Sequence, residues 1–330
     1  MLKEIYLITG AGGHLGGAII RELRKRDKKV RALLLTGEKG LPWPEVEVCY
    51  GDVCDWESLR PFFAVTEVGR VIVIHCAGIV TIQSNFDQRV MDVNVGGTKN
   101  ILEWCRRIHA DKLIYVSSVH AIPEQKKGEM IRETTFFSEK KVKGLYAKSK
   151  AAATALVLEA AYEGLNVSVV HPSGIIGPYD DGDNHVVSMI RSFCRGRFPV
   201  GVVGGYDFVD VRDVAKGVLS CVEAGVPGLC YILSGHYYSV KALLALLSEV
   251  TGRKAPRIYL PAAVARSFVL GAAWVAKMTH TKPVFTNYSI YTLGTNACFS
   301  YQRARQELHY HVRPMRQTLE DTVRWLERRV

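Results

Sequence analysis

The stretch Glu4-Ile-Tyr-Leu-Ile-Thr-Gly-Ala-Gly-Gly-His-Leu-Gly16 decides the fold of this chain. Its first six residues are mostly apolar and end at a glycine, as in a short buried strand. A helical pattern of apolar residues follows from Ala18. Strand, glycine-rich turn and helix in this order predict a dinucleotide-binding unit, although Gly-x-x-Gly-x-x-Gly is less common than Gly-x-Gly-x-x-Gly.

Each glycine of this turn has an expected task. Gly10 allows the tight turn, Gly13 lets the backbone approach a pyrophosphate, and Gly16 permits close packing of helix on strand. The backbone amides at the start of the helix, including those of His14 and Leu15, then face the phosphate charge. We therefore expect these five residues to belong to the cofactor site.

The alternation of strand and helix continues along the chain. Further apolar runs that predict strands occupy residues 30–35, 46–50, 71–76, 112–117, 166–171 and 230–233. Strands separated by helical segments indicate a parallel sheet with helices on both faces. The predicted fold class is α/β, a doubly wound sheet of the Rossmann type with a small C-terminal α/β substrate-binding lobe.

Short polar or small residues follow several of these strands. Asp52 comes after the third strand, where its carboxylate could accept a hydrogen bond from an adenine amino group or cap the next helix. We favour the adenine role, with Val53 beside it, because Asp55 already supplies a cap. After the fourth strand, Cys76, Ala77 and Gly78 are small enough for a ribose to lie against the backbone.

Tyr146 and Lys150 are four residues apart and therefore share one face of a helix. A free phenol ionises near pH ~10 and is a poor acid or base at neutral pH. A nearby ammonium, and a cationic oxidised nicotinamide, would lower that pKa toward the working range of a proton-transfer catalyst. A serine hydroxyl from the pair at 117–118 could hold the substrate oxygen.

These motifs together resemble the extended branch of the short-chain dehydrogenase/reductase superfamily over nearly the whole chain. The resemblance implies that Ser118, rather than Ser117, is the catalytic serine, with Tyr146 and Lys150 as its partners. It identifies the segment 93–98 with the family's structural asparagine, Asn94, which we place in the catalytic set. The segment 171–178 resembles the loop that closes over the nicotinamide, and implies cofactor contacts from Pro172, Gly174 and Ile175.

Within that branch the chain most resembles dihydroflavonol 4-reductases and 3β-hydroxysteroid dehydrogenases, including in its C-terminal segment. Sugar-nucleotide dehydratases of the superfamily carry an Asp-Glu pair where this chain has Val119 and His120. Sugar-nucleotide epimerases usually carry an arginine where this chain has Tyr206. Because a bidentate clamp for a diphosphate is missing, we expect an apolar alcohol or ketone as substrate.

Composition excludes several other classes. The chain of 330 residues is long enough for a Rossmann unit and a small cap. Its eight cysteines occur singly, which predicts reduced thiols and no metal site. Because Met1-Leu-Lys leads straight into the first strand, we expect no signal peptide and a cytoplasmic protein. The formal net charge is +11, but the basic residues gather at 21–29 and near the C-terminus without a recognition motif, so we expect no nucleic-acid partner.

We expect residues 1–178 to form the dinucleotide-binding core and residues 179–330 to form most of the substrate lobe, with 208–235 returning to the core. The apolar run 260–278 contains Pro261, Arg266 and Lys277 and falls short of a membrane span. It predicts a buried or substrate-lining helix, or an interfacial helix that makes peripheral membrane contact. A small molecule is the expected partner, and a homodimer is compatible with the sequence.

The substrate side is less well defined by sequence. His120 lies two residues after the catalytic serine, as a substrate contact or as a polar group satisfied by the backbone. The full set of candidate substrate contacts is Thr81, Ser118, His120, Tyr146, His185, Met189 and Phe208.

Three functions fit these observations. The leading one is reduction of a ketone or oxidation of an alcohol on a steroid- or flavonoid-like molecule. The alternatives are a sugar-nucleotide 4-epimerase and a redox sensor that binds the dinucleotide without turnover. For the cofactor, Leu34 and Leu35 stand where an acid would select NAD(H) or an arginine would select NADP(H). We lean slightly to NADP(H); a preference for NADH would require the loop near Glu38 to fold back onto the ribose.

Overall fold

A seven-stranded parallel sheet forms the centre of the larger lobe. The computed structural model describes residues 4–66, 69–82, 85–180, 184–196, 198–267 and 286–328. The sheet has the order β10-β6-β5-β4-β1-β2-β3. Its strands match the seven predicted ones within one residue at each end, which confirms the predicted fold class. They are β1 (Glu4–Thr9), β2 (Lys29–Leu34), β3 (Glu47–Tyr50), β4 (Arg70–His75), β5 (Lys112–Val116), β6 (Val167–Pro172) and β10 (Cys230–Leu233).

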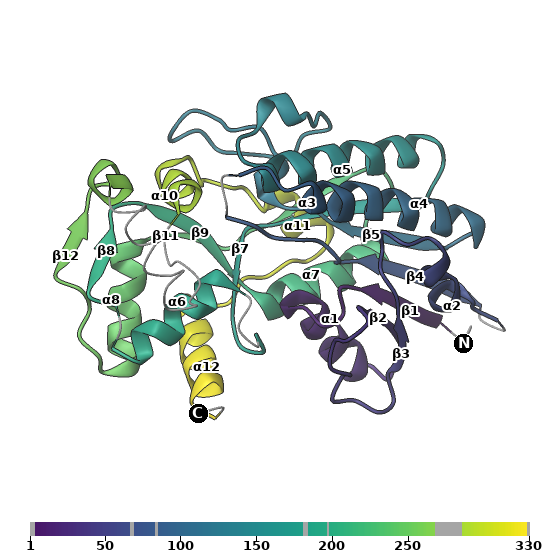
Figure 1. Cartoon of the computed structure of the whole chain (residues 1–330), viewed down its shortest axis with the longest axis horizontal. Helices are drawn as coiled ribbons and strands as arrows, with labels where there is room; N and C mark the ends of the chain where they lie inside the picture. Colours follow the sequence, from purple (N-terminus) through teal and green to yellow (C-terminus); the bar gives the residue numbers. More distant parts are fainter. Residues whose placement is uncertain are drawn as a thin grey trace.

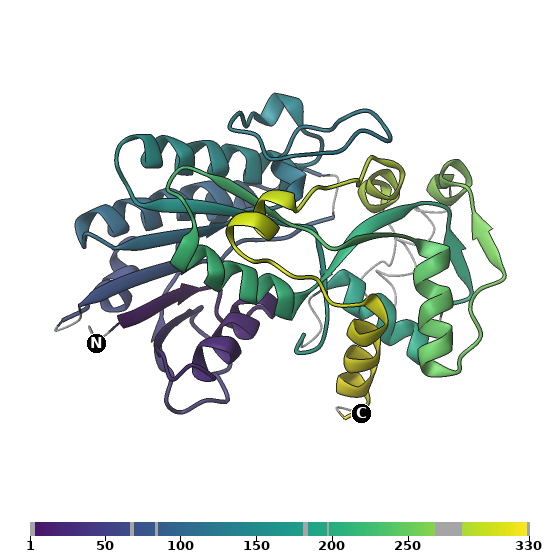
Figure 2. The ribbon, with the colours of Figure 1, turned by 180° about the vertical axis from the view of Figure 1, so that it is seen from behind.

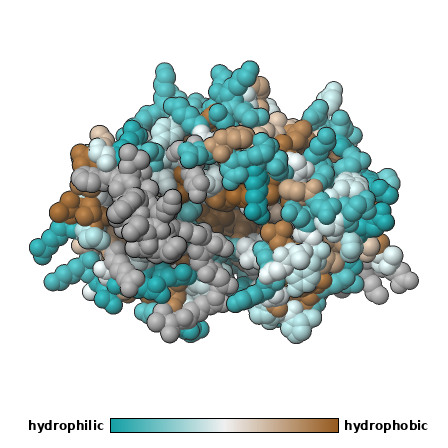
Figure 3. All heavy atoms as spheres, viewed as in Figure 1, coloured by the Kyte–Doolittle hydropathy of each residue, from teal (hydrophilic) through white to brown (hydrophobic). Residues whose placement is uncertain are grey.

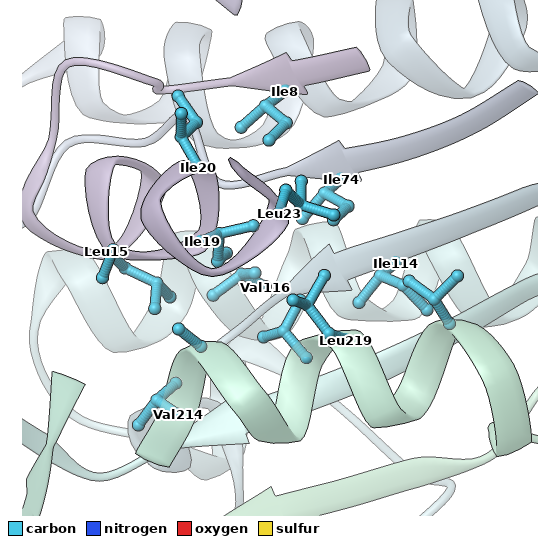
Figure 4. Packing of buried hydrophobic residues seen from close by; sticks show 14 of the residues in the cluster. Ile8, Leu15, Ile19, Ile20, Leu23, Ile74, Ile114, Val116, Val214 and Leu219 are labelled. Atoms are coloured by element: carbon cyan, nitrogen blue, oxygen red, sulfur yellow. The ribbon is translucent and has the colours of Figure 1, made fainter. Parts of the chain in front are cut away.

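Helices cover both faces of this sheet (Figures 1 and 2). One face carries α1 (His14–Arg24) and α7 (Val211–Ala224). Leu15, Ile19 and Leu23 recur every four residues and share one side of α1. Figure 4 shows these side chains gathered between the sheet and α7. The other face carries α2 (Arg60–Phe63), α4 (Thr98–Arg107) and α5 (Leu145–Tyr162), which follow the short elements η1 (Glu57–Leu59), α3 (Gln88–Met91), the π-helix η2 (Asp92–Gly97) and η4 (Glu139–Lys141).

The strand order reverses between β1 and β4. From β1 the chain runs outward to β2 and β3, and then crosses to β4, on the other side of β1, before continuing to β5 and β6. In doubly wound sheets, ligands bind outside the carboxyl ends of the strands at such a reversal. The glycine turn after β1, the small residues after β4 and the serines after β5 all lie at this edge.

A smaller lobe is built around a three-stranded sheet of order β11-β9-β7. Its core combines buried side chains from β9 with those of the helices α6, α8 and α12. Its elements are β7 (Gly174–Ile176), α6 (His185–Cys194), β8 (Val200–Val202), β9 (Gly205–Asp210), β11 (His236–Ser239), α8 (Val240–Thr251), β12 (Ile258–Leu260), α10 (Asn287–Gly294) and α12 (Met315–Glu327). β8 and β12 pair as a second, two-stranded sheet.

Parts of the C-terminal half lie in the larger lobe. α7 and β10 do so, whereas β9, from 205 to 210, pairs within the smaller sheet. A second return, which we did not predict, involves α11 (Gln302–Glu307) and the residues after it, because Ala304, Leu308 and Tyr310 are buried in the larger core. The boundary at residue 178 remains a prediction.

The apolar run at 260–278 lies mostly outside the described residues, which end at 267 and resume at 286. Within the described parts of the chain, the helices are too short or too polar to cross a membrane. Those same parts hold no group of three His, Cys, Asp or Glu side chains placed to bind a metal ion.

Candidate active site

The glycine turn leaves a bare backbone surface at the start of α1. Gly10 has a φ of +65°, and a Cβ there would lie 2.7 Å from the amide nitrogen of Ala77. A Cβ on Gly16 would lie 2.2 Å from the carbonyl oxygen of Gly10, so helix and turn touch through backbone alone. Gly13 caps α1, whose first turn contains no acidic residue. Unopposed amides at a helix start suit a phosphate group.

His14 and Leu15 begin α1 and point in different directions. Nε2 of His14 donates to the Pro178 carbonyl oxygen at 2.9 Å, and Nδ1 of the same ring lies 3.3 Å from Nδ2 of Asn184. Burial lowers the pKa of His14. The Leu15 side chain packs in the core, so only its backbone can face a cofactor. His14 thus ties the glycine turn to the smaller lobe.

Glu38 closes the turn after β2. Its Oε2 accepts a hydrogen bond from the backbone N–H of Leu35 at 2.9 Å. A Cβ on Gly12 would lie 3.4 Å from the same oxygen and 3.3 Å from Cδ2 of Leu34. Leu34 is buried and Leu35 is 42% exposed. The carboxylate of Glu38 therefore stands next to the glycine turn, at the end of the second strand.

Asp52 and Val53 lie in the turn after β3. One oxygen of Asp52 accepts the backbone N–H of Cys54 at 2.9 Å, while Asp55 accepts the N–H of Glu57 at the start of η1. Val53 is buried against Gly97. Asp55 is thus the residue that caps the following helix, and the adenine role of Asp52 remains a prediction.

Asn94 fastens the turn that follows β4. Its Oδ1 accepts the backbone N–H of Ile79 at 2.7 Å, and its Nδ2 donates to the Ile79 carbonyl and to Oγ of Ser149. Asn94 lies in the π-helix η2, an irregularity that sequence patterns do not reveal. Its side chain is fully engaged with these partners, and its place in the catalytic set remains a prediction.

Cys76, Ala77 and Gly78 form that turn. The Ala77 N–H donates to Oγ1 of Thr9 at 3.2 Å. A Cβ on Gly78 would lie 3.0 Å from Oδ1 of Asn94, a tight contact, and 3.4 Å from Nζ of Lys150. Burial raises the pKa of the Cys76 thiol to about 12, so this cysteine stays protonated. The cofactor contacts of these three residues remain predictions.

Ser117 and Ser118 follow β5 and turn to opposite sides. The Ser117 hydroxyl pairs with Oγ1 of Thr154 on α5 at 2.7 Å, inside the core. The Ser118 hydroxyl accepts the backbone N–H of His120 at 3.2 Å, and it also acts on the Tyr146 phenol, whose pKa it lowers. Ser117 is thus engaged in the core, and the catalytic role of Ser118 remains a prediction.

Tyr146 and Lys150 lie one turn apart on α5 and are both buried. Nζ of Lys150 donates to the carbonyl oxygen of Val116 at 2.8 Å, at the end of β5. Burial raises the pKa of Tyr146 to about 12, and the neighbouring Ser118 hydroxyl lowers that pKa by less than burial raises it. Burial also lowers the pKa of Lys150 to about 8. In the protein alone, loss of hydration thus outweighs the lowering of the tyrosine pKa that the sequence suggested.

His171 contacts the backbone of Ser118, the predicted catalytic serine. Its Nδ1 lies 2.9 Å from the carbonyl oxygen of Ser118 and, since a carbonyl only accepts, must carry the proton. Its ring stacks on Phe137 at 5.3 Å, and burial lowers its pKa to about 4. Sequence reasoning placed His171 in the nicotinamide loop and missed this supporting contact.

His120 joins two tyrosines beside Tyr146. Its Nε2 lies 3.0 Å from the Tyr206 hydroxyl and its Nδ1 lies 3.4 Å from the Tyr288 hydroxyl. Its ring packs edge-on against that of Tyr146, with 5.9 Å between ring centroids. Burial lowers the pKa of His120 to about 4, so the ring is neutral at physiological pH. We did not predict Tyr288, because no sequence motif surrounds it.

The remaining candidates are spread over several segments. Phe208 is buried on β9 and packs against Tyr206, which links it to the His120 group. Thr81 lies on the segment after β4, and His185 and Met189 lie one turn apart on α6; all three are half-buried. The substrate contacts of these three residues remain predictions.

The predicted nicotinamide loop forms strands. Pro172 ends β6 and pairs with Leu233. Gly174 begins β7, and a Cβ there would lie 2.9 Å from the Asp207 carbonyl oxygen, so this glycine allows β7 to approach β9. The carbonyl oxygen of Ile175 accepts from the Asn184 side chain at 2.8 Å. Their cofactor contacts remain predictions.

These surfaces fit a nicotinamide dinucleotide. The glycine turn and the amides of α1 offer room and partial positive charge for a pyrophosphate. Gly78, beside Lys150 and Asn94, offers the bare backbone that a ribose requires. The cofactor fits because glycines leave the backbone exposed at these positions, where larger side chains would fill the space.

Comparison with known proteins identifies the family and several relatives of this chain. The model of the NAD dependent epimerase/dehydratase family matches residues 6–232. Sterol demethylase protein B of Methylococcus capsulatus is 31% identical, over 98% of each chain. The decarboxylating sterol-4-alpha-carboxylate 3-dehydrogenase erg26 of Schizosaccharomyces pombe is 26% identical over 97% of each chain. The 4-hydroxy-2-methyl-3-oxo-4-farnesyl-3,4-dihydroquinoline-1-oxide ketoreductase of Stigmatella aurantiaca is 26% identical over 96% of this chain and 95% of its own.

Solved structures share the whole architecture. The crystal structure of gox2253 superposes with a TM-score of 0.84 at 30% identity, over 98% of each chain. The UDP-glucose 4-epimerase of Thermus thermophilus, solved as a complex with NAD, superposes with a TM-score of 0.78 at 21% identity, over 99% of this chain and all of its own. The second likeness shows a shared fold.

Proposed function

Because the chain belongs to the NAD-dependent epimerase/dehydratase family and is an NAD(P)-dependent oxidoreductase of the extended short-chain dehydrogenase/reductase type, we propose that it interconverts an alcohol and a ketone on a lipophilic small molecule. The observation that carries the proposal is the placement of buried Tyr146 and Lys150 one helical turn apart on α5, with Lys150 held at the end of β5 and Ser118 close enough to lower the pKa of the phenol. A serine donor, a phenol and an ammonium at one strand end suit a carbonyl oxygen that gains or loses a proton.

Each side chain has a defined task in this reaction. A bound nicotinamide cofactor supplies the acceptor or donor of the hydride. Ser118 holds the substrate oxygen, and Tyr146 gives the proton to that oxygen in reduction or takes it in oxidation. Lys150, held by the Val116 carbonyl, adds positive charge that favours the phenolate once the site is filled. Buried surroundings keep water away from the transfer.

The substrate class follows from Tyr206. The family resemblance puts Tyr206 at the position where sugar-nucleotide epimerases usually carry an arginine that binds a diphosphate. In this protein the Tyr206 hydroxyl forms a hydrogen bond with the neutral His120 ring. Seen from the side of Figure 1, apolar residues line a hollow in the middle of the molecule (Figure 3). The relatives named for sterols and for a farnesylated quinoline point to lipophilic substrates. Two of those names also place an oxygen-bearing group on the carbon next to the reacting one.

Two alternatives carry less support. A sugar-nucleotide 4-epimerase shares the fold, but Tyr206 offers a diphosphate no positive charge. A sensor without turnover would not need Ser118, Tyr146 and Lys150 together. A free small molecule as substrate, a cytoplasmic location and a homodimer remain parts of the proposal.

For the cofactor we now favour NAD(H) over the NADP(H) to which the sequence leaned. Neither Leu34 nor Leu35 carries a charge, but the loop beyond them brings the Glu38 carboxylate back to the glycine turn. A carboxylate there can accept hydrogen bonds from ribose hydroxyls and repels a 2′-phosphate. The loop that carries Glu38 thus folds back toward the glycine turn, as a preference for NADH would require.

The test is a screen of the purified protein against sterols, flavonoids, bicyclic ketones and nucleotide sugars, in which absorbance of the reduced cofactor is followed with NADH and with NADPH. We expect turnover with lipophilic ketones or alcohols only. In Tyr146→Phe nearly all turnover should vanish while cofactor affinity stays almost unchanged, because only the proton-carrying oxygen is lost. Lys150→Ala should harm both. A Phe variant within a few-fold of the parent would overturn the assigned roles, and turnover of nucleotide sugars alone would favour the epimerase.

A further inference from the structure

His120, Tyr206 and Tyr288 form a group whose hydrogen bonds can be counted. A neutral imidazole carries one N–H and one lone pair, so it donates to one tyrosine and accepts from the other. The tyrosine that receives the N–H keeps its own O–H free. The tyrosine that gives its proton to the ring keeps a free oxygen lone pair. Either tautomer of His120 thus leaves one donor and one acceptor.

A small cavity adjoins this group. It measures about 30 Å³ and is lined by His120, Tyr206 and Tyr288 together with apolar residues such as Val119, Ile131 and Phe299. That volume holds one water molecule or a group of that size. His120 both packs against Tyr146 and lines the cavity, so the cavity lies one side chain away from the proton-transferring phenol.

The described lining of the cavity carries one acidic and one basic side chain. Glu124 and Lys143 are the acidic and basic side chains in the described lining, and both are exposed to solvent. The Tyr291 hydroxyl donates to Glu124, and Nζ of Lys143 lies 5.1 Å from the centre of the Tyr291 ring. The three side chains of the His120 group are neutral near pH 7, because burial lowers the pKa of the histidine and raises those of both tyrosines. The inner wall therefore offers hydrogen bonds without formal charge.

We propose that the His120–Tyr206–Tyr288 group binds a hydroxyl group on the substrate carbon next to the reacting one, so that the protein selects α-hydroxyketones and vicinal diols. The inference rests on the proposed function and deepens it. A hydroxyl both donates and accepts, as the group does, and it fits a space for one water. The His120 ring packs against the Tyr146 ring, so the group lies beside the oxygen that Tyr146 would hold, and the carbon next to the reacting one is the nearest substrate position that could carry the bound hydroxyl.

The experiment compares three ketones that differ at one atom position: 1-tetralone, 2-hydroxy-1-tetralone and 2-methoxy-1-tetralone. Reduction by the full-length protein is followed at saturating NADH, and kcat/KM is measured for each. We expect the hydroxyketone to exceed the parent ketone by roughly 10²-fold, because a site built to bond a hydroxyl leaves its own polar groups unpaired when the hydroxyl is missing. The methyl ether should fall below the hydroxyketone, since it cannot donate and overfills the cavity.

Variants then locate the effect. Tyr288→Phe and Tyr206→Phe each remove one oxygen, and His120→Phe keeps the ring stacking while it removes both hydrogen bonds. Each should reduce the ratio of hydroxyketone to parent ketone at least tenfold, mainly through KM for the hydroxyketone. Tyr162→Phe is the matched control, because Tyr162 lies at the far end of α5 and is 94% exposed. Its ratio should equal that of the parent protein.

The outcomes separate the two proposals. Equal reduction of the three ketones, or a ratio that survives all three substitutions, overturns the hydroxyl site and leaves the proposed function standing. No reduction of any of them, together with no turnover in the wider screen, overturns the proposed function and the hydroxyl site with it. A ratio that collapses in the three variants and not in Tyr162→Phe supports both.

Discussion

Ser117 and Ser118 are adjacent residues with different surroundings, and this difference is testable. Ser118→Ala should lower kcat roughly 10²–10³-fold, as loss of one donor to a developing oxyanion does. Ser117→Ala should leave kcat within a few-fold and cost about 1 kcal/mol of unfolding free energy, because Thr154 loses one of its two hydrogen bonds and keeps the one to the Lys150 carbonyl. Steady-state kinetics and urea unfolding of both variants give the ranking. The reverse order in kcat would show that the assignment of the serine is shifted by one residue.

Glu38 is the second residue whose role can be isolated. The wild-type protein should bind NADH at least about tenfold more tightly than NADPH, since a 2′-phosphate would lie beside a carboxylate. Glu38→Gln removes the charge but keeps a side-chain oxygen that can accept from the Leu35 N–H, so the preference should fall toward unity.

Fluorescence titration with the two reduced cofactors measures this directly. Glu45→Gln serves as the control, because Glu45 is an exposed carboxylate that pairs with Arg24 on the surface. A preference for NADPH in the wild-type protein would contradict the role of Glu38 and agree instead with the NADP(H) preference expected from the sequence.

At the scale of secondary-structure elements, ion pairs fasten α12 to the start of α7. Arg313, just before α12, donates to both oxygens of buried Asp213, with Nη2 2.7 Å from Oδ1. It also lies 3.6 Å from Asp210, which caps α7 and pairs with Arg212. Removal of one partner leaves a buried charge unpaired, so Arg313→Leu should cost roughly 3 kcal/mol of unfolding free energy.

Arg316 gives the matched comparison for this prediction. It lies in the first turn of α12 and pairs with Glu249 on α8, but both side chains are at least half exposed. Exposed pairs contribute little, so Arg316→Leu should cost less than about 1 kcal/mol. Urea unfolding of the two variants tests the difference. Equal losses would mean that α12 is held by its apolar face alone.

At the scale of the whole molecule, buried titratable groups set how stability depends on pH. Burial lowers the pKa of His75 to about 3 and those of His120 and His171 to about 4. The unfolded chain takes up protons on these rings near pH ~6.5, whereas the folded protein does not. Stability from these three groups is therefore present above that pH and is lost as the pH falls toward 4.

Asp207 opposes this trend. Burial raises its pKa to about 7, so the folded protein holds a proton that the unfolded chain releases near pH ~4. Its contribution is present at low pH and is lost as the pH rises toward 7. Because three groups act against one, the free energy of unfolding should fall between pH 6.5 and 4.5. Asp207→Asn should steepen that fall; an increase in stability over the same interval would contradict the account.

The sequence by itself determined the alternation of strands and helices, the glycine turn and the shared helix face of Tyr146 and Lys150, the proposed proton-transfer pair. These features depend on residues close together in the chain. Apolar runs select strands, glycine spacing selects the turn, and a spacing of four puts Tyr146 and Lys150 on one helix face. Such local preferences act before distant parts of the chain meet, so all seven strands of the sheet could be predicted.

Tertiary structure alone decided the chemistry around that pair. His120 meets Tyr206 and Tyr288 from 86 and 168 positions away, and no local pattern records such a meeting. Glu38 reaches the glycine turn only because its loop folds back, and the π-helix that carries Asn94 follows no sequence period. The pKa values of Tyr146 and Lys150 likewise depend on burial, which the packed fold imposes, because removal from water opposes the charged form of any side chain.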